Sequence, residues 1–479
     1  MSSVATSPAA LLQLLAPSLQ LVWDTSPLVA SPHVEIVDIA RLRREGAATI
    51  AWSAAFSGDS DVVAAAQWLA RATAKAVGIE SASIAPLYAA RASGGYEGLT
   101  VPALNLRSQV FDMSRTALEL AASIDGAAVI FELARSEQTY TFQRPADYAT
   151  SINCGAIAAG WHGPLFIQGD HYQFVAAKYA NDPEGVTAEI ARACRLAVDA
   201  GYRNIDIDAS TLVDLSLPTI AEQQRLNVER SAEIAALIRD LEPAGIEISV
   251  GGEIGEVGKS NSTVEELAAY LDGFALALER LRPGARGLRK VSVQTGTSHG
   301  GVPLPDGGVA TVALDFGVLE SLGALARERG LAGAVQHGAS TLPDELFGRF
   351  PEVGTAEIHL ATGFQNALYD HPAFPAELRT EINAWLHTNA SDEAKSGDTE
   401  EQFLYRTRKK ALGPFKRALW EIPRKGEILA AQRERLATLF DHLGVAGSRQ
   451  VVDRYVPSDR KSTRLNSSHI PLSRMPSSA

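Results

Sequence analysis

The sequence predicts an α/β fold, namely a TIM (β/α)₈ barrel preceded by a mostly helical N-terminal extension. From Gly94 onward, short apolar runs typical of buried strands alternate with amphipathic stretches of helical periodicity. Eight such runs occur, and eight strands joined by crossover helices is the number that closes a parallel barrel. Several runs end in a histidine or a carboxylate beside glycine, at the position where such a barrel carries its chemistry.

Each strand is predicted from one apolar run, and Gly201, Gly245 and Gly330 end three of the amphipathic stretches as helix stops. The predicted strands are residues 101–106, 127–133, 164–168, 203–208, 246–251, 290–294, 332–336 and 356–360. The predicted helices include residues 111–124, 186–200, 221–241, 263–281 and 313–329. The main competitor, an open doubly wound sheet, would carry a glycine-rich dinucleotide loop after its first strand. Asn105-Leu106-Arg107-Ser108 stands there instead.

The chain divides into three predicted segments. Residues 1–93 form the helical extension, and residues 94–459 form the barrel together with C-terminal helices. Residues 460–479 are rich in serine and arginine and have no periodicity. They resemble translated sequencing-adapter read-through, so we interpret them as a non-native tail and exclude them from the functional reasoning.

Composition excludes several classes of protein. The chain has 479 residues, of which 46% are hydrophobic, and a formal net charge of −12. The negative charge argues against nucleic acid or an anionic membrane as a partner, and no apolar run reaches the length of a membrane span. The two cysteines, Cys154 and Cys194, lie in apolar helical stretches and are interpreted as buried thiols. With no signal-peptide pattern in residues 1–22, we expect a cytoplasmic protein.

Three histidines each follow a different predicted strand: His171, His299 and His337. Because the carboxyl ends of the strands meet at one rim of a barrel, we expect these side chains to converge. Three imidazole nitrogens leave one position on a zinc ion open, which is the catalytic rather than the structural arrangement. The sequence therefore predicts a catalytic Zn²⁺ site, with another divalent metal as the alternative.

Carboxylates stand at the same rim. Glu253 ends the fifth strand and is expected to be a further metal ligand or a partner of one. Asp170 directly precedes a predicted ligand and is the candidate general acid or base. Asp206 and Asp208 alternate on the fourth strand and so share one face. Asp208 is nearer the carboxyl end and is the better candidate for the site.

Loops rich in glycine and hydroxyl groups follow the last strands of the predicted barrel. Gly338 and Ser340 follow the seventh strand, Thr362 follows the eighth, and Gly300 extends the same surface. Barrels often bind phosphate with loops at these positions, where glycine permits a close backbone approach and hydroxyls donate hydrogen bonds. Ordinary turns have the same composition, so each loop alone is weak evidence.

Taken together, these motifs resemble the class II, zinc-dependent fructose-bisphosphate and tagatose-bisphosphate aldolases over roughly residues 84–370. The similar stretches occur in the order of the family: Val-Pro-Ala-Leu-Asn (101–105), Gly-Asp-His-Tyr (169–172), Ile-Asp-Ala-Ser (207–210), Gly-Glu-Ile-Gly-Glu-Val-Gly (252–258), Gly-Thr-Ser-His-Gly (296–300) and His-Gly-Ala-Ser-Thr-Leu-Pro (337–343).

The resemblance implies roles for single residues. In the family, the residues that match the three histidines hold the zinc, the match to Glu253 is an alternate ligand, and the match to Asp170 is the acid/base at the aldehyde oxygen. Asn105, in the similar first strand, is a candidate for substrate binding. The positions that hold the ketose phosphate are matched by Gly300, Gly338, Ser340 and Thr362. A monovalent cation near the phosphate is also implied.

The chain departs from the family pattern at several places. His359 stands where the last strand usually carries the asparagine that steadies the enediolate, and Ala134 replaces a serine at the end of the second strand. Residues 301–303 lack the usual Tyr-Lys pair, and residues 258–262 lack the loop carboxylate that moves a proton. We therefore expect an intact metal site and altered substrate recognition. We expect His359 to be one of the substrate-binding residues.

The sequence thus predicts a metal-dependent aldolase (a lyase) that cleaves a phosphorylated ketose, such as fructose 1,6-bisphosphate, to dihydroxyacetone phosphate and an aldehyde. The expected partners are a small sugar phosphate and further copies of the chain in a homo-oligomer. The alternative is a non-catalytic or accessory barrel subunit that binds metal or sugar phosphate. A zinc hydrolase on the same barrel is a third reading, but its usual His-x-His on the first strand is absent; Asn105 and Arg107 stand there.

Overall fold

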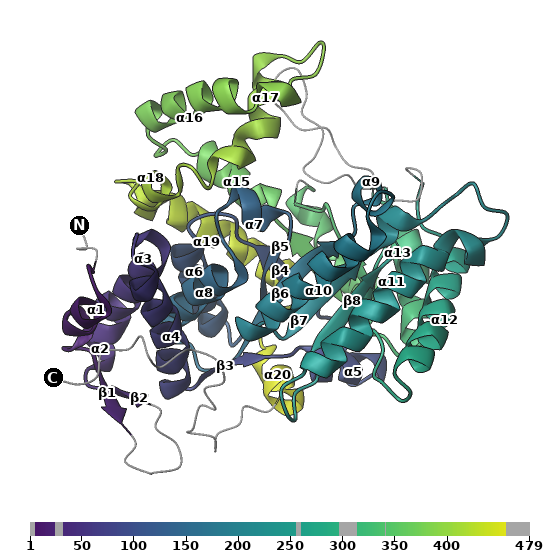
Figure 1. Ribbon diagram of the computed structural model, residues 1–479, viewed down its shortest axis with the longest axis horizontal. Helices are drawn as coiled ribbons and strands as arrows, with labels where there is room; N and C mark the ends of the chain where they lie inside the picture. Colours follow the sequence, from purple (N-terminus) through teal and green to yellow (C-terminus); the bar gives the residue numbers. More distant parts are fainter. Residues whose placement is uncertain (1–4, 24–31, 255–259, 297–313, 341, 457–479) are drawn as a thin grey trace.

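Eight parallel strands form a closed barrel in the computed structural model, which describes residues 5–23, 32–254, 260–296, 314–340 and 342–456 (Figure 1). Each strand pairs with its neighbour in chain order, and the pairing of the last strand with the first closes the ring. The strands are β4 (Val101–Asn105), β5 (Ile130–Ala134), β6 (Gly163–Gln173), β7 (Asn204–Asp208), β8 (Ser249–Glu253), β9 (Lys290–Ser292), β10 (Ala334–Gln336) and β11 (Glu357–Leu360). The predicted barrel is confirmed, strand by strand.

Amphipathic helices surround this barrel, and their polar starts match the sequence signals. Thr219 with Glu222, and Thr263 with Glu266, form reciprocal capping boxes that satisfy the first free N–H groups of two of the helices. The helices between the strands are α6 (Val110–Ser123), α7 (Glu137–Tyr140), α8 (Pro145–Ala159), α9 (Ala176–Tyr179), α10 (Pro183–Asp199), η2 (Ser210–Leu212), α11 (Ile220–Leu241), α12 (Val264–Leu281), α13 (Phe316–Glu328), η3 (Asp344–Leu346) and α14 (Arg349–Glu352). Because helices cover the outside and side chains fill the inside, whole strands such as β4 and β5 are buried.

The N-terminal region is mostly helical, as predicted, and it contains one antiparallel hairpin. Its elements are α1 (Pro8–Leu15), β1 (Leu19–Trp23), β2 (Pro32–Ile36), α2 (Ile39–Arg41), η1 (Leu42–Gly46), α3 (Ala47–Phe56), α4 (Ser60–Ala76), β3 (Ile79–Ala82) and α5 (Ala85–Ala92). Helices α3 and α4 pack on α8, and β3 extends the sheet beside the start of β6. From α5, the Tyr88 hydroxyl donates a hydrogen bond to Glu357 inside the barrel. Strand β3 and helix α5 therefore lie at the amino-terminal end of the barrel, whereas α3 and α4 cover part of its outside.

Most of the C-terminal helices lie toward the opposite end, whereas the last one packs on α5. The C-terminal helices are α15 (Thr362–Tyr369), α16 (Ala376–Asn389), η4 (Ser391–Glu393), α17 (Glu400–Thr407), η5 (Arg408–Ala411), α18 (Lys416–Trp420), α19 (Lys425–His442) and α20 (Arg449–Tyr455). Figure 1 shows α16 and α17 on the side of α7 and α15, which follow the carboxyl ends of strands, whereas α5 and α20 lie on the other side. Residues between Leu368 and Ile428 bury a hydrophobic cluster of their own. A separate small core thus holds these helices over the predicted site.

Two other expectations can be compared with the structure. Cys154 and Cys194 are buried free thiols, as interpreted from the sequence. None of the helices in the described ranges is long and apolar enough to cross a membrane.

Candidate active site

His171 owes its position to an irregularity in β6. The pairing of β6 with β7 shifts register between Gly169 and Tyr172, and His171 has a left-handed backbone with φ of 42°. A side chain on Gly169 could not be accommodated, because its Cβ would lie 2.3 Å from the Tyr172 ring. Positive φ in a non-glycine residue costs on the order of 1–3 kcal/mol and is concentrated at functional sites. The Gly-Asp-His-Tyr motif therefore encodes a bulge that turns His171 into the mouth of the barrel.

Two of the three predicted histidine ligands meet at this mouth. His171 Nε2 and His337 Nδ1 lie 3.1 Å apart, and Asp170 has an oxygen within 4.8 Å of both. Two nitrogens bound to one tetrahedral zinc ion at 2.0–2.1 Å would be about 3.3 Å apart. In addition, Asp170 Oδ1 is buried without a hydrogen-bond partner among the described residues. The two imidazole nitrogens are therefore spaced to hold a divalent metal ion, with the carboxylate of Asp170 beside it.

The carboxylates predicted at the rim gather around His171. Asp208 Oδ2 is 3.1 Å and Glu253 Oε2 is 3.6 Å from His171 Nδ1. Glu253 Oε2 is also 4.0 Å from His337 Nε2. Burial raises the pKa of Glu253 to about 8. A cation at this position would favour the ionised carboxylate.

His359, the departure on the last strand, lies on the other side of His337, with the two ring centres 4.0 Å apart. Its Nδ1 is 3.0 Å from Glu132 and 3.4 Å from Asp170, and its Nε2 is 2.7 Å from Glu357. Burial, together with the neighbouring carboxylate of Asp170, raises the pKa of Glu132 to about 8, although His359 opposes this shift. His359 therefore lies between Asp170 and the carboxylates in the interior of the barrel, within 4 Å of both.

The interior of the barrel beneath His359 contains a layer of buried charges, formed by Asp206, Lys290 and Glu357. Only Asp206 was singled out from the sequence; we call this group the ionic layer. Lys290 Nζ is 2.9 Å from Asp206 and 2.8 Å from Gln168, and it is also paired with Glu357. Burial disfavours ionisation of Glu357, but the Lys290 ammonium, followed by His359, lowers its pKa to about 2. Gly251 is required here, because a Cβ at that position would lie 2.2 Å from Asp206. A lysine at the start of a predicted strand normally suggests a surface position, so no sequence signal marked this buried pair.

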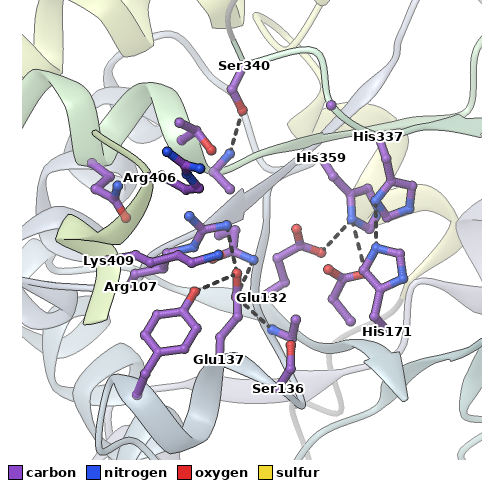
Figure 2. Close-up of a pocket in the computed structure, with 18 of the residues that line it drawn as sticks. Arg107, Glu132, Ser136, Glu137, His171, His337, Ser340, His359, Arg406 and Lys409 are labelled. Carbon is purple, nitrogen blue, oxygen red and sulfur yellow. Dashed lines mark hydrogen bonds and ion pairs between the residues drawn. The ribbon is translucent and has the colours of Figure 1, made fainter. Parts of the chain in front are cut away.

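A cavity of about 310 Å³ opens above these groups. Its histidine end, defined here as Asp170, His171, His337 and His359, faces a basic end formed by Arg107, Arg406 and Lys409 (Figure 2). Arg107 follows β4, whereas Arg406 and Lys409 belong to α17 and η5 of the C-terminal helices. Arg406 and Lys409 were not predicted, because nothing in a helical sequence indicates that it folds back over a barrel.

Five of the predicted substrate-binding residues line this cavity, namely Asn105, Gly338, Ser340, His359 and Thr362, whereas Asp208 lies beneath it beside His171. Asn105 Nδ2 donates a 2.7 Å hydrogen bond to Glu137. The Ser340 hydroxyl accepts a 2.7 Å hydrogen bond from the N–H of Ala361, which joins the two predicted phosphate loops. His299 and Gly300 lie outside the described residues.

A cavity at the carboxyl ends of barrel strands, with convergent imidazoles and carboxylates, is typical of a metal-dependent barrel enzyme. Residues 92–412, more than half of the chain, match the family described as fructose-bisphosphate aldolase class-II. The chain therefore belongs to this family, and the resemblance noted in its motifs is confirmed.

Two of the solved structures that the chain resembles support the same fold. The chain is similar to a probable tagatose 6 phosphate kinase from Sinorhizobium meliloti 1021, with a TM-score of 0.50, 18% identity, and coverage of 74% of this chain and 90% of that one. It is also similar to a glycerol-complexed fructuronate-tagaturonate epimerase from Cohnella laeviribosi, with a TM-score of 0.54, 11% identity, and coverage of 89% and 91%. A fructose-bisphosphate aldolase from Campylobacter jejuni matches at a TM-score of 0.44, with 17% identity and coverage of 77% and 96%.

Proposed function

We propose that this protein is a metal-dependent aldolase that cleaves a carbon–carbon bond in a ketose with an anionic group. A phosphorylated ketose such as fructose 1,6-bisphosphate, which gives dihydroxyacetone phosphate and an aldehyde, is the substrate expected from the family. One observation carries the proposal: at the cavity, two imidazole nitrogens, from His171 and His337, lie 3.1 Å apart and have the carboxylate of Asp170 within 4.8 Å.

His171 and His337 would hold the metal, with Glu253 and Asp208 beside them. A divalent ion there would act as a Lewis acid that withdraws electrons from the ketone of the substrate. Zinc is the expectation, and the nitrogen and oxygen donors also suit other divalent ions. The monovalent cation near the phosphate stays a prediction.

Asp170 is the proposed acid/base. Its carboxylate is buried at the cavity wall, 3.8 Å from His171 Nε2. When the carbon–carbon bond breaks, the hydroxyl that becomes the aldehyde must lose its proton, and Asp170 is the group placed to accept it. His359, 3.4 Å away, is a positioning residue that orients this carboxylate.

Retro-aldol assays test the proposal directly. Fructose 1,6-bisphosphate and tagatose 1,6-bisphosphate are supplied with and without a chelator, and the metal content of the purified protein is determined alongside. Cleavage that the chelator abolishes would support the aldolase. Bound metal without cleavage of any ketose tested would instead favour the alternative of a non-catalytic or accessory barrel.

A second candidate is epimerisation of a keto sugar acid. The match to the epimerase covers 89% of this chain, beyond the residues 92–412 of the family match. Epimerisation and aldol cleavage both need withdrawal of electrons by a carbonyl. D-Fructuronate and D-tagaturonate are therefore included in the assay, with NMR of the products, because epimerisation keeps all carbons in one molecule and cleavage yields two.

We also propose a homo-oligomer of this chain in the cytoplasm, acting on a small-molecule sugar substrate and not on nucleic acid or membranes. Size-exclusion chromatography with light scattering tests the oligomeric state.

A further inference from the structure

The basic end of the cavity contains none of the motifs singled out in the sequence, and it is built largely by the C-terminal helices. Arg406 and Lys409 stand one helical turn apart, on α17 and η5, and reach the cavity wall opposite the histidine end (Figure 2). Arg107 meets them from the loop after β4. The cations lie at one end of a cavity of about 310 Å³, which is the lower limit of the usual range for small-molecule pockets. A ligand that reaches both ends is therefore small.

Two of the three cations already have a carboxylate partner. Arg107 pairs with Glu137 Oε1 at 2.7 Å, and Glu137 is itself fixed by hydrogen bonds from the Asn105 amide and the N–H of Ala134. Arg406 pairs with Asp398. These carboxylates neutralise the two guanidinium groups, whose role at this end is to supply N–H donors in a fixed geometry.

Lys409 is different. Within the described part of the chain its ammonium has no carboxylate partner, whereas its neighbours Arg408 and Lys410 pair with Asp370 and Glu393, each at 2.7 Å. Lys409 is also the only one of these three neighbours that lines the cavity. The basic end therefore presents one uncompensated positive charge.

We propose that the basic end recognises the singly charged carboxylate of a keto sugar acid, and that Lys409 is the residue that determines this specificity. A carboxylate has one negative charge to match the single free cation, and its planar pair of oxygens suits guanidinium donors. A phosphate monoester carries a charge of about −1.5 to −2 near pH 7, so it would leave negative charge uncompensated. The inference rests on the proposed function, because it assumes that the histidine end holds the ketone.

Binding of two matched sugars tests this inference. D-Fructuronate and D-fructose 6-phosphate share a ketohexose skeleton and differ only in the anionic group at C6, and neutral D-fructose provides the baseline. Titration calorimetry uses the full-length, metal-loaded protein with Asp170→Asn, a substitution expected to slow turnover. We expect D-fructuronate to bind at least about tenfold more tightly than D-fructose 6-phosphate, a difference of about 1.4 kcal/mol.

Lys409→Met keeps the aliphatic stem and removes the charge. It should weaken D-fructuronate about tenfold or more and leave D-fructose unchanged, while the matched control Lys410→Met should change neither. Tighter binding of D-fructose 6-phosphate, or an equal loss from both lysine variants, would overturn the inference. If the binding pattern is as expected but no sugar is turned over by the wild-type protein, the basic end stands and the proposed function fails. If instead the protein cleaves a phosphorylated ketose in a chelator-sensitive reaction that does not depend on Lys409, the proposed function stands and the inference about the basic end fails.

Discussion

The two ends of the cavity are built in different ways. The histidine end comes from the ends of β6, β10 and β11, where the closed sheet fixes the backbone. The strained residue His171 lies in the bulge of β6, and the residues that flank it pair with β5 and β7. The basic end comes mainly from helices with a small core of their own, placed over the barrel. On the proposals above, the barrel would supply the groups for the reaction, and the C-terminal helices would supply those that select the substrate. Substitutions can separate these contributions.

The largest effect is expected at the histidine end. His337→Ala removes one of two imidazoles that lie 3.1 Å apart, so metal content and activity should fall together. Mutation of residues that hydrogen-bond to metal ligands already lowers metal affinity or activity about 10–100-fold. Loss of a ligand itself should lower them further. Metal analysis and initial rates measure the effect, and circular dichroism checks the fold. Full activity in metal-free protein would contradict the assignment.

Asp170→Asn separates the acid/base from the metal ligands. The amide is nearly the same size, so the metal should stay bound, but it cannot accept a proton. Turnover is expected to fall about 10²–10⁴-fold, which is the usual contribution of general acid–base catalysis. A fall in turnover with unchanged metal content would support this role. An unchanged rate would show that Asp170 takes no part in the reaction.

Lys290→Met examines the ionic layer beneath the histidine end. The change leaves Asp206 and Glu357 buried without their cation, and breaking a buried ion pair costs about 3–5 kcal/mol. Urea unfolding should show this loss of free energy of unfolding. The control Lys410→Met breaks a partly exposed pair with Glu393 and should cost at most about 1 kcal/mol. Equal losses in the two variants would mean that the layer does not stabilise the barrel.

The smallest effect is expected from removal of the last residues of the sequence. Deletion of residues 460–479 should leave the metal content, the rates and the free energy of unfolding unchanged, because this tail is interpreted as non-native. Expression yield and thermal unfolding of the shortened chain provide the check. A loss of solubility or activity would show that the tail contributes to the protein.

The sequence by itself determined the barrel and much of its histidine end. Alternation of apolar runs with amphipathic stretches is set by local periodicity, so all eight strands could be predicted from it. His171 and His337 were recognisable because glycine-containing motifs at strand ends mark places where the backbone must bend or approach closely.

The tertiary structure alone decided which charges meet. Lys290, Glu357 and Asp206 come from three strands far apart in the chain, and only closure of the sheet turns them into one buried layer. Arg406 and Lys409 look like ordinary helix-surface cations until the small C-terminal core places them over the barrel. Helical periodicity predicts which face of a helix is buried, but it carries no information about what lies opposite. That is set by long-range packing, and for this reason the basic end could not be predicted.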